Sequence, residues 1–133
     1  MSKKFVIATI AAFVLLVGSG YLVHGMWLEP EYGQLPNLMR SAEEGAKHMP
    51  YLMIAQLLAA LSLVWIYERG RSDKPWMGQG IRFGIAAAIF APVVKFITYY
   101  AVQNEPHTLA LHQIIGEGAA MVIICMVVAR IYK

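Results

Sequence analysis

The stretch Phe5–Leu28, FVIATIAAFVLLVGSGYLVHGMWL, is apolar over almost its whole length. At 1.5 Å per residue, a helix of about 20 residues crosses a hydrocarbon core of about 30 Å. Three further blocks of this kind follow, at residues 48–67, 80–103 and 108–132. A chain of 133 residues has too little interior to bury four such blocks, so lipid must cover much of their surface. The sequence therefore predicts an all-α fold: a bundle of four transmembrane helices, arranged up-down-up-down, in a single integral membrane domain over residues 1–133.

The composition supports this class of protein. Hydrophobic residues make up 59% of the chain and charged residues 14%, whereas a soluble domain carries about a quarter charged residues. The net charge of +3 is modest and does not indicate nucleic-acid binding, so the expected partner is the lipid bilayer. Lys3 and Lys4 precede an apolar run longer than the roughly 7–15 residues of a signal-peptide core. We expect an uncleaved first helix.

Basic residues gather on one side of the predicted bundle. Arg40 and Lys47 are the only two on the opposite side, and eight lie in or near the N-terminus, the second loop and the C-terminus: Lys3, Lys4, Arg69, Arg71, Lys74, Arg82, Arg130 and Lys133. Under the positive-inside rule, this bias predicts a bacterial inner-membrane protein with both termini in the cytoplasm. We also expect the basic second loop to contact lipid headgroups.

Three local features refine the predicted helices. Leu35–Ala46, in the first outer loop, could form a short interfacial helix with Leu38, Met39 and Ala42 on one side. Pro50 falls in the first turn of the second predicted helix, where the missing amide donor costs nothing. Pro92 lies in the middle of the third helix and predicts a kink there.

A polar cluster is predicted in the outer half of the membrane. Lys95 and Glu117 lie at matched depth on consecutive antiparallel helices, and an isolated charge there costs at least about 2.5–3.5 kcal/mol. We therefore expect these two side chains to face each other. Gln56 lies at nearly the same level, and Gln113 and Tyr99 each lie one helical turn from a member of the pair. Two roles stay open: an ion pair that fixes helix register, or a proton relay, ion site or polar ligand pocket.

All four histidines fall toward the outer side: His24, His48, His107 and His112. Imidazole and carboxylate groups are the usual ligands of zinc, copper or iron, and outer glutamates lie nearby. His24 and His112 lie on the first and fourth helices, which we expect to neighbour each other in a closed arrangement, and could face each other across a b-type haem. Alternatively, these histidines sit in water or cap helix ends.

The helix ends are similar to those of a known group of proteins. The relevant stretches are Gly20–Trp27, Pro50–Met53, Gly80–Gly84 and Gln113–Glu117. They resemble an uncharacterised family of small four-helix bacterial membrane proteins. The resemblance implies the same fold and topology and no established activity.

Three functions are compatible with these features. The first is a non-enzymatic accessory protein or scaffold, either self-associating as a homo-oligomer or a subunit of a larger membrane complex. The second is an outward-facing protein that binds a ligand, a metal or b-haem at a site built from His24, His112 and the neighbouring Gln113 and Glu117. The third is an oligomeric proton-coupled carrier that uses Lys95 and Glu117. The sequence has no glycine-rich phosphate loop and no evident nucleophile–base pair, which favours a non-enzyme.

Overall fold

The computed structural model describes all 133 residues and contains helices and no strands. Along the chain the elements are α1 (Lys3–Gly20), η1 (Tyr21–Trp27), α2 (Glu29–Gly33), α3 (Ala42–Gly70), α4 (Trp76–Ala88), η2 (Ile89–Val93), α5 (Val94–Val102) and α6 (His107–Ile131). They form four long apolar helices, here called the first to fourth spans: Lys3–Trp27, Ala42–Gly70, Trp76–Val102 and His107–Ile131. The prediction of four such helices is confirmed.

The surface of these helices is that of a membrane protein. Each span is long and apolar enough to cross a bilayer, yet only 11% to 22% of its most apolar stretch is buried inside the chain. Large apolar side chains such as Ile10, Leu58 and Phe90 point outward. A soluble monomer rarely exposes apolar surface on this scale, whereas lipid covers it at little cost. The four spans therefore suggest a membrane protein.

The first and fourth spans match their predicted bounds to within two residues, whereas the second begins at Ala42 rather than His48. Ser41 caps this earlier start, because its Oγ accepts a hydrogen bond from the Glu44 amide at 3.2 Å. Glu43 and Glu44 in the first turn also favour a helix start. Pro50 consequently lies inside α3 rather than in its first turn, and that prediction is wrong.

The predicted short helix over Leu35–Ala46 is also wrong. The first outer loop contains a short helix, but it is α2 at Glu29–Gly33, with Pro30 in its first turn. Residues 42–46 belong to the capped start of α3. The sequence signal of the amphipathic stretch was weaker than the signals for these two helix starts.

Two segments of the spans have π-helical hydrogen bonding. One is η1 at the end of the first span, and the other is η2, which contains Pro92. Pro92 lacks an amide donor and cannot continue an α-helical ladder, so the predicted irregularity takes the form of a π segment. Single-turn π segments are often found at functional sites. Here the polar residues His24 and Lys95 lie within or next to them.

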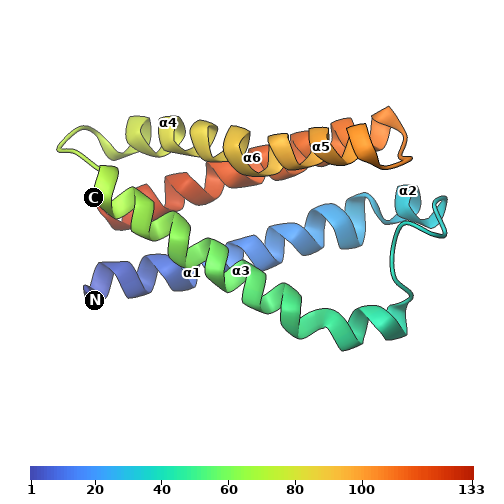
Figure 1. Cartoon of the computed structure of the whole chain (residues 1–133). Coiled ribbons are helices and arrows are strands. Elements are labelled where there is room, and N and C mark those ends of the chain that lie inside the picture. Colours follow the sequence, from blue (N-terminus) through green and yellow to red (C-terminus); the bar gives the residue numbers. More distant parts are fainter.

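The spans pack in the spatial order third, fourth, first, second (Figure 1). The arrangement is open, not closed as predicted, because the second and third spans diverge from the turn that joins them (Figure 1). At that turn the rings of Tyr67 and Phe83 lie 5.3 Å apart, centre to centre. Up-down-up-down connectivity is retained, with both termini and this turn at one end of the bundle and α2 at the other (Figure 1).

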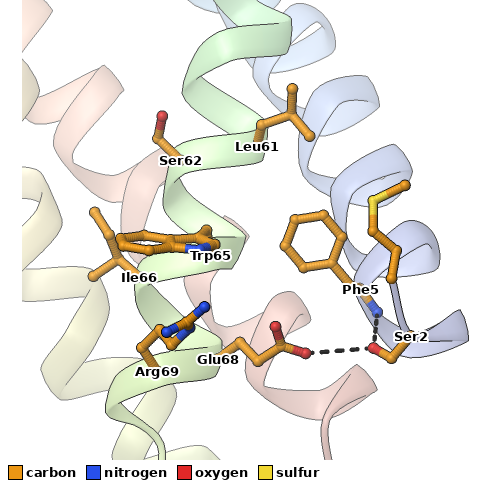
Figure 2. A pocket seen from close by; sticks show the side chains of 9 residues that line it. Ser2, Phe5, Leu61, Ser62, Trp65, Ile66, Glu68 and Arg69 are labelled. Carbon is orange, nitrogen blue, oxygen red and sulfur yellow. Dashed lines mark hydrogen bonds between the residues drawn. The ribbon is translucent and has the colours of Figure 1, made fainter.

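The main apolar core lies at the end that holds the termini. It includes Ala8, Ala12, Ala60, Val64 and Val128. Polar contacts fasten its rim: Glu68 Oε1 accepts hydrogen bonds from Ser2 Oγ at 3.3 Å and Tyr132 Oη at 3.1 Å (Figure 2 shows the first). This end of the bundle is thus fixed by packing, which leaves the opposite end for polar chemistry.

The third and fourth spans pack at backbone distance. A Cβ atom placed on Gly84 would lie 2.7 Å from Val122 Cα, and one on Gly80 would lie 2.9 Å from Met126 Cα. Small residues allow membrane helices to approach this closely. The register of α4 against α6 is therefore set by these glycines.

We expect Gly84→Ala to destabilise the protein by roughly 1–3 kcal/mol, because the new methyl group would overlap the backbone of α6. Gly118→Ala is the matched control, since no atom lies within 4 Å of its added Cβ. That change should be neutral or stabilising by up to about 1 kcal/mol. Unfolding of both variants in detergent measures the difference, and equal effects would contradict the assigned helix contact.

Candidate functional site

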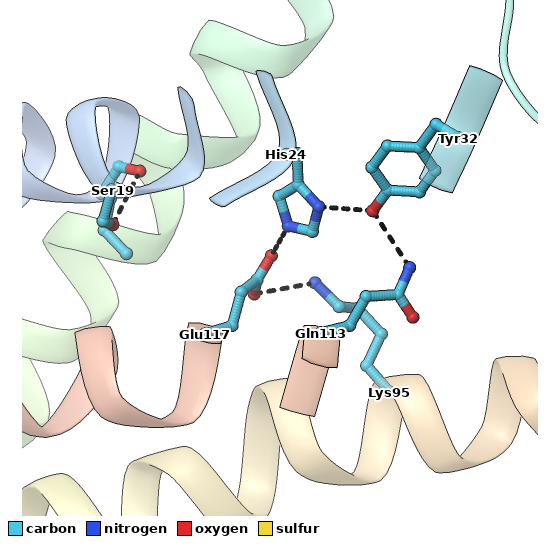
Figure 3. Close-up of polar contacts among 7 residues, drawn as sticks. Ser19, His24, Tyr32, Lys95, Gln113 and Glu117 are labelled. Atoms are coloured by element: carbon cyan, nitrogen blue, oxygen red, sulfur yellow. Dashed lines mark hydrogen bonds and ion pairs between the residues drawn. The ribbon is translucent and has the colours of Figure 1, made fainter. Parts of the chain in front are cut away.

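The structure brings Lys95 and Glu117 together. Lys95 follows the π segment η2 and lies in the first turn of α5, and Glu117 lies within α6. The Lys95 Nζ donates to Glu117 Oε2 at 3.2 Å (Figure 3). The sequence predicted this contact from the matched depth of the two charges.

Glu117 has a second partner, His24 of η1. The His24 Nε2 lies 2.5 Å from Glu117 Oε1, so each carboxylate oxygen contacts one basic group (Figure 3). One carboxylate thus connects the first, third and fourth spans. The sequence analysis grouped His24 with His112, Gln113 and Glu117; the structure brings His24 to Glu117, whereas His112 bonds Glu31.

Tyr32 of α2 extends the network toward the outer loop. Its hydroxyl lies 2.5 Å from His24 Nδ1 and accepts a hydrogen bond from Gln113 Nε2 at 3.0 Å (Figure 3). Burial, reinforced by the nearby Glu117 charge, raises the pKa of Tyr32, so the hydroxyl stays protonated at neutral pH. We name the series Gln113, Tyr32, His24, Glu117 and Lys95 the polar chain.

The roles of donor and acceptor along the polar chain follow from Tyr32. Its oxygen accepts from Gln113, so its single proton is available for His24 Nδ1. A neutral His24 then carries its proton on Nε2 and donates it to Glu117. A protonated His24 would instead donate from both nitrogens. The chain therefore has two arrangements that differ by one proton.

A contact between His112 and Glu31 also holds α2 in place. The His112 Nδ1 lies 2.8 Å from Glu31 Oε2, and the His112 ring lies 5.3 Å from that of Trp27. Consecutive residues of α2, Glu31 and Tyr32, thus bond consecutive residues of α6, His112 and Gln113. This double contact positions the short helix over the outer end of the polar chain.

The polar chain is only partly covered by the protein itself. Side-chain exposure is 25% for both His24 and Glu117, and it rises to 42% for Lys95. The Lys95 Nζ also lies 4.3 Å from the centre of the Phe96 ring, which screens one side of the ammonium group. The other side of the Lys95 ammonium group is not covered by the protein.

The other predicted site residues are less involved. Gln56 lines a narrow cavity of about 40 Å³ together with Ser19 and Glu117, and the cavity has room for a water molecule. Gln56 and Glu117 are not joined by a direct hydrogen bond. Tyr99 packs edge-on against Phe96. It makes no hydrogen bond with Lys95, which bonds Glu117. Gln56 is thus next to the polar chain, whereas Tyr99 lies outside it.

His48 and His107 lie outside the polar chain. His48 bonds the backbone oxygen of Glu44 one turn earlier, at 2.7 Å. His107 is the first residue of α6 and lines a shallow apolar hollow with Ile97 and Tyr100. His48 was expected to begin the second helix, but α3 begins at Ala42 and His48 lies inside it.

The histidines do not form a metal or haem site in this arrangement. No group of three or more His, Cys, Asp or Glu side chains converges as metal ligands would. Both ring nitrogens of His24 are engaged, by Tyr32 and Glu117, and one nitrogen of His112 is engaged by Glu31. A histidine that ligates a haem iron or metal ion needs one ring nitrogen free for it, and His24 has none free. The residues present therefore do not fit the predicted haem between His24 and His112.

Sequence reasoning missed Tyr32 and considered Glu31 only as one of the outer glutamates. Both lie in a loop segment whose helical structure was not predicted, so their positions relative to α6 could not be inferred. The available signal was the Glu29-Pro30 start, which is favourable for the first turn of a helix.

The chain matches no protein-family model, no curated protein and no solved structure.

We expect Glu117→Met to destabilise the protein by about 2–3 kcal/mol, because two basic groups lose their carboxylate partner. Lys95→Met should cost less, since His24 still compensates Glu117. The double variant should recover part of the loss, and a double-mutant cycle of unfolding in detergent measures this coupling. The control is Lys47→Met, which breaks an exposed pair with Glu44 of similar length, 3.3 Å, and should cost under about 0.5 kcal/mol. Additive effects of the two site substitutions would contradict the pairing.

Proposed function

We propose that the chain is a non-enzymatic protein of the bacterial inner membrane that works in an assembly, foremost as a homo-oligomer that buries the open side of the bundle. Membership in a larger membrane complex is the alternative form of this proposal. The observation that carries it is the exposure of Lys95, 42% of whose side chain is uncovered within a membrane span.

The proposed orientation has both termini in the cytoplasm. Both termini and the turn between α3 and α4 lie at one end of the bundle (Figure 1), and eight of the basic residues belong to these segments and the adjoining helix ends. The other end carries Arg40 and Lys47. Such a bias supports a cytoplasmic location for the basic end. Lys95 then lies on the outer half of the third span.

An exposed ammonium at this depth calls for a covering group. Lys95 lies about two helical turns from the end of its span at Val102. A charged side chain in hydrocarbon is costly unless it pairs, reaches the interface or faces protein or water. Its pairing with Glu117 meets part of that requirement, and the uncovered side remains. A neighbouring protein surface would shield it from lipid.

The open order of the spans supports the same proposal. The second and third spans diverge, so the bundle has two edges with no partner helix within the chain (Figure 1). A closed four-helix bundle buries its polar residues between facing helices. A second copy could complete that burial here, next to the polar chain.

Site-directed crosslinking tests the oligomer. In a Cys125→Ala background, Ala91→Cys places a thiol one turn from Lys95, on the same face of the third span. Ile97→Cys is the control on the opposite flank of α5. We expect oxidation of native membranes to give several-fold more covalent dimer with Ala91→Cys than with Ile97→Cys. Equal yields, with a purely monomeric mass in native mass spectrometry, would overturn the homo-oligomer; a stable foreign subunit in that spectrum would favour the larger complex.

A second candidate function, proton conduction in a proton-coupled carrier, is favoured by the continuity of the polar chain. Hydrogen bonds run unbroken from Tyr32 through His24 and Glu117 to Lys95. Chains of carboxylates and histidines within membranes are common in proton relays. Here His24 can pass a proton because its two nitrogens contact different groups. The chain stops at Lys95, so this function too would require a neighbouring subunit or a water-filled space.

Proteoliposomes with an enclosed pH dye test this second function. If the polar chain conducts protons, Glu117→Gln should lower the flux at least about tenfold, because it removes the ionisable group between His24 and Lys95. Tyr99→Phe, outside the polar chain, should leave the flux unchanged. A flux that does not exceed that of empty liposomes, or that survives Glu117→Gln, would eliminate conduction through this route.

A further inference from the structure

A basic pocket lies at the end of the bundle that holds the termini, between the end of α3 and the start of α4. It has a volume of about 500 Å³, and its charged lining consists of Arg71, Lys74 and Arg82. Its apolar lining includes Ile66 and Phe83. We call it the turn pocket. It is at the opposite end of the bundle from the polar chain.

The three cations of the turn pocket have no anionic partner. No carboxylate oxygen lies within 4 Å of the charged nitrogens of Arg71, Lys74 or Arg82, and none of the three takes part in an ion pair. Asp73, the acidic residue of this turn, lines an adjacent cavity rather than this one. Arg71 and Lys74 also line that adjacent cavity, where the Arg71 guanidinium lies 5.2 Å from the centre of the Tyr132 ring. Arginine and lysine side chains that line one hollow without a carboxylate partner favour a multiply charged oxyanion, and phosphate suits the planar arginine group.

The turn that carries these cations is held rigidly. The Gln79 Oε1 accepts a hydrogen bond from the Ser72 amide at 2.8 Å. The Gln79 Nε2 donates to the backbone oxygens of Ser72 at 2.8 Å and Lys74 at 2.5 Å. The side-chain amide of Gln79 thus fixes the backbone that carries Arg71 and Lys74. A pre-organised site loses less free energy on binding than a flexible loop.

From this geometry we propose that the turn pocket binds the headgroup phosphate of an anionic phospholipid. The pocket lies where two apolar spans end, which is the level of lipid headgroups in a bilayer. Ile66 lines the pocket and its side chain is 52% exposed, so apolar surface continues beside the charged lining. A lipid contacts both kinds of surface at once, whereas a free phosphate ion uses only the cations. The proposal is independent of the oligomer and of the polar chain.

Native mass spectrometry of the detergent-purified full chain tests the proposal. Phosphatidylglycerol and phosphatidylcholine are titrated separately onto the wild type and two double variants. Arg71→Gln/Arg82→Gln removes two cations of the turn pocket. Lys3→Gln/Arg69→Gln removes the same charge from the same end; Arg69 lies over the Trp65 ring, in a different groove of α3 (Figure 2). Far-UV circular dichroism checks that each variant is folded, and the single variants Arg82→Gln and Arg69→Gln replace any pair that is not.

The expected result is tighter binding of phosphatidylglycerol than of phosphatidylcholine by the wild type. Loss of the turn-pocket cations should weaken phosphatidylglycerol binding about tenfold, against less than about threefold for the control variant. Equal losses in both variants, or equal binding of the two lipids, would overturn the proposal. Displacement of phosphatidylglycerol by low millimolar inorganic phosphate would also overturn it, because the site would then belong to a soluble ion.

Discussion

The Glu117 carboxylate is the group on which the half of this molecule next to α2 depends. Its two oxygens contact His24 at 2.5 Å and Lys95 at 3.2 Å, so one side chain of the fourth span connects the first and third spans. In water, contacts of this kind contribute little, because each charge is solvated in the alternative state. Within a bilayer the alternative for each group is an unpaired charge in hydrocarbon. The surrounding medium therefore turns an ordinary ion pair into a constraint on how three helices are rotated.

That constraint acts together with backbone packing at the other end. Gly80 and Gly84 bring α4 to within backbone contact of α6, and this contact fixes the distance at which the third span continues toward α5. The π segment η2 lies between the two contacts and contains Pro92. It changes the rotation of the helix between the glycine contact and Lys95. A uniform α-helix would lack this change in rotation between the close packing and the polar pair.

The sequence was sufficient to predict what depends on one dimension, the distance along a helix. Lys95 and Glu117 were placed together because counting residues from the helix ends gives their depth, and the cost of burying a charge gives the reason to pair. Rotation about the helix axis is harder to infer, and this is why His24 was expected to face His112, which bonds Glu31 in the structure. Gln56 was placed at the right level, but the divergence of the second span leaves a small cavity between it and Glu117. Tyr32 could not be predicted, because its position depends on how a loop folds back.

The way in which α2 folds back links the outer loop to the membrane interior. Glu31 and Tyr32 are adjacent, yet they contact different parts of the site: Glu31 pairs with His112, whereas Tyr32 bonds both Gln113 and His24. Any movement of α2 away from α6 would therefore break both contacts and remove the hydrogen bond on His24 Nδ1. His24 would then lose one of the two contacts that determine which ring nitrogen carries the proton, and only the Glu117 carboxylate would hold it on Nε2. The contact between α2 and His24 thus helps to hold the imidazole in the tautomer whose Nε2 proton bonds Glu117.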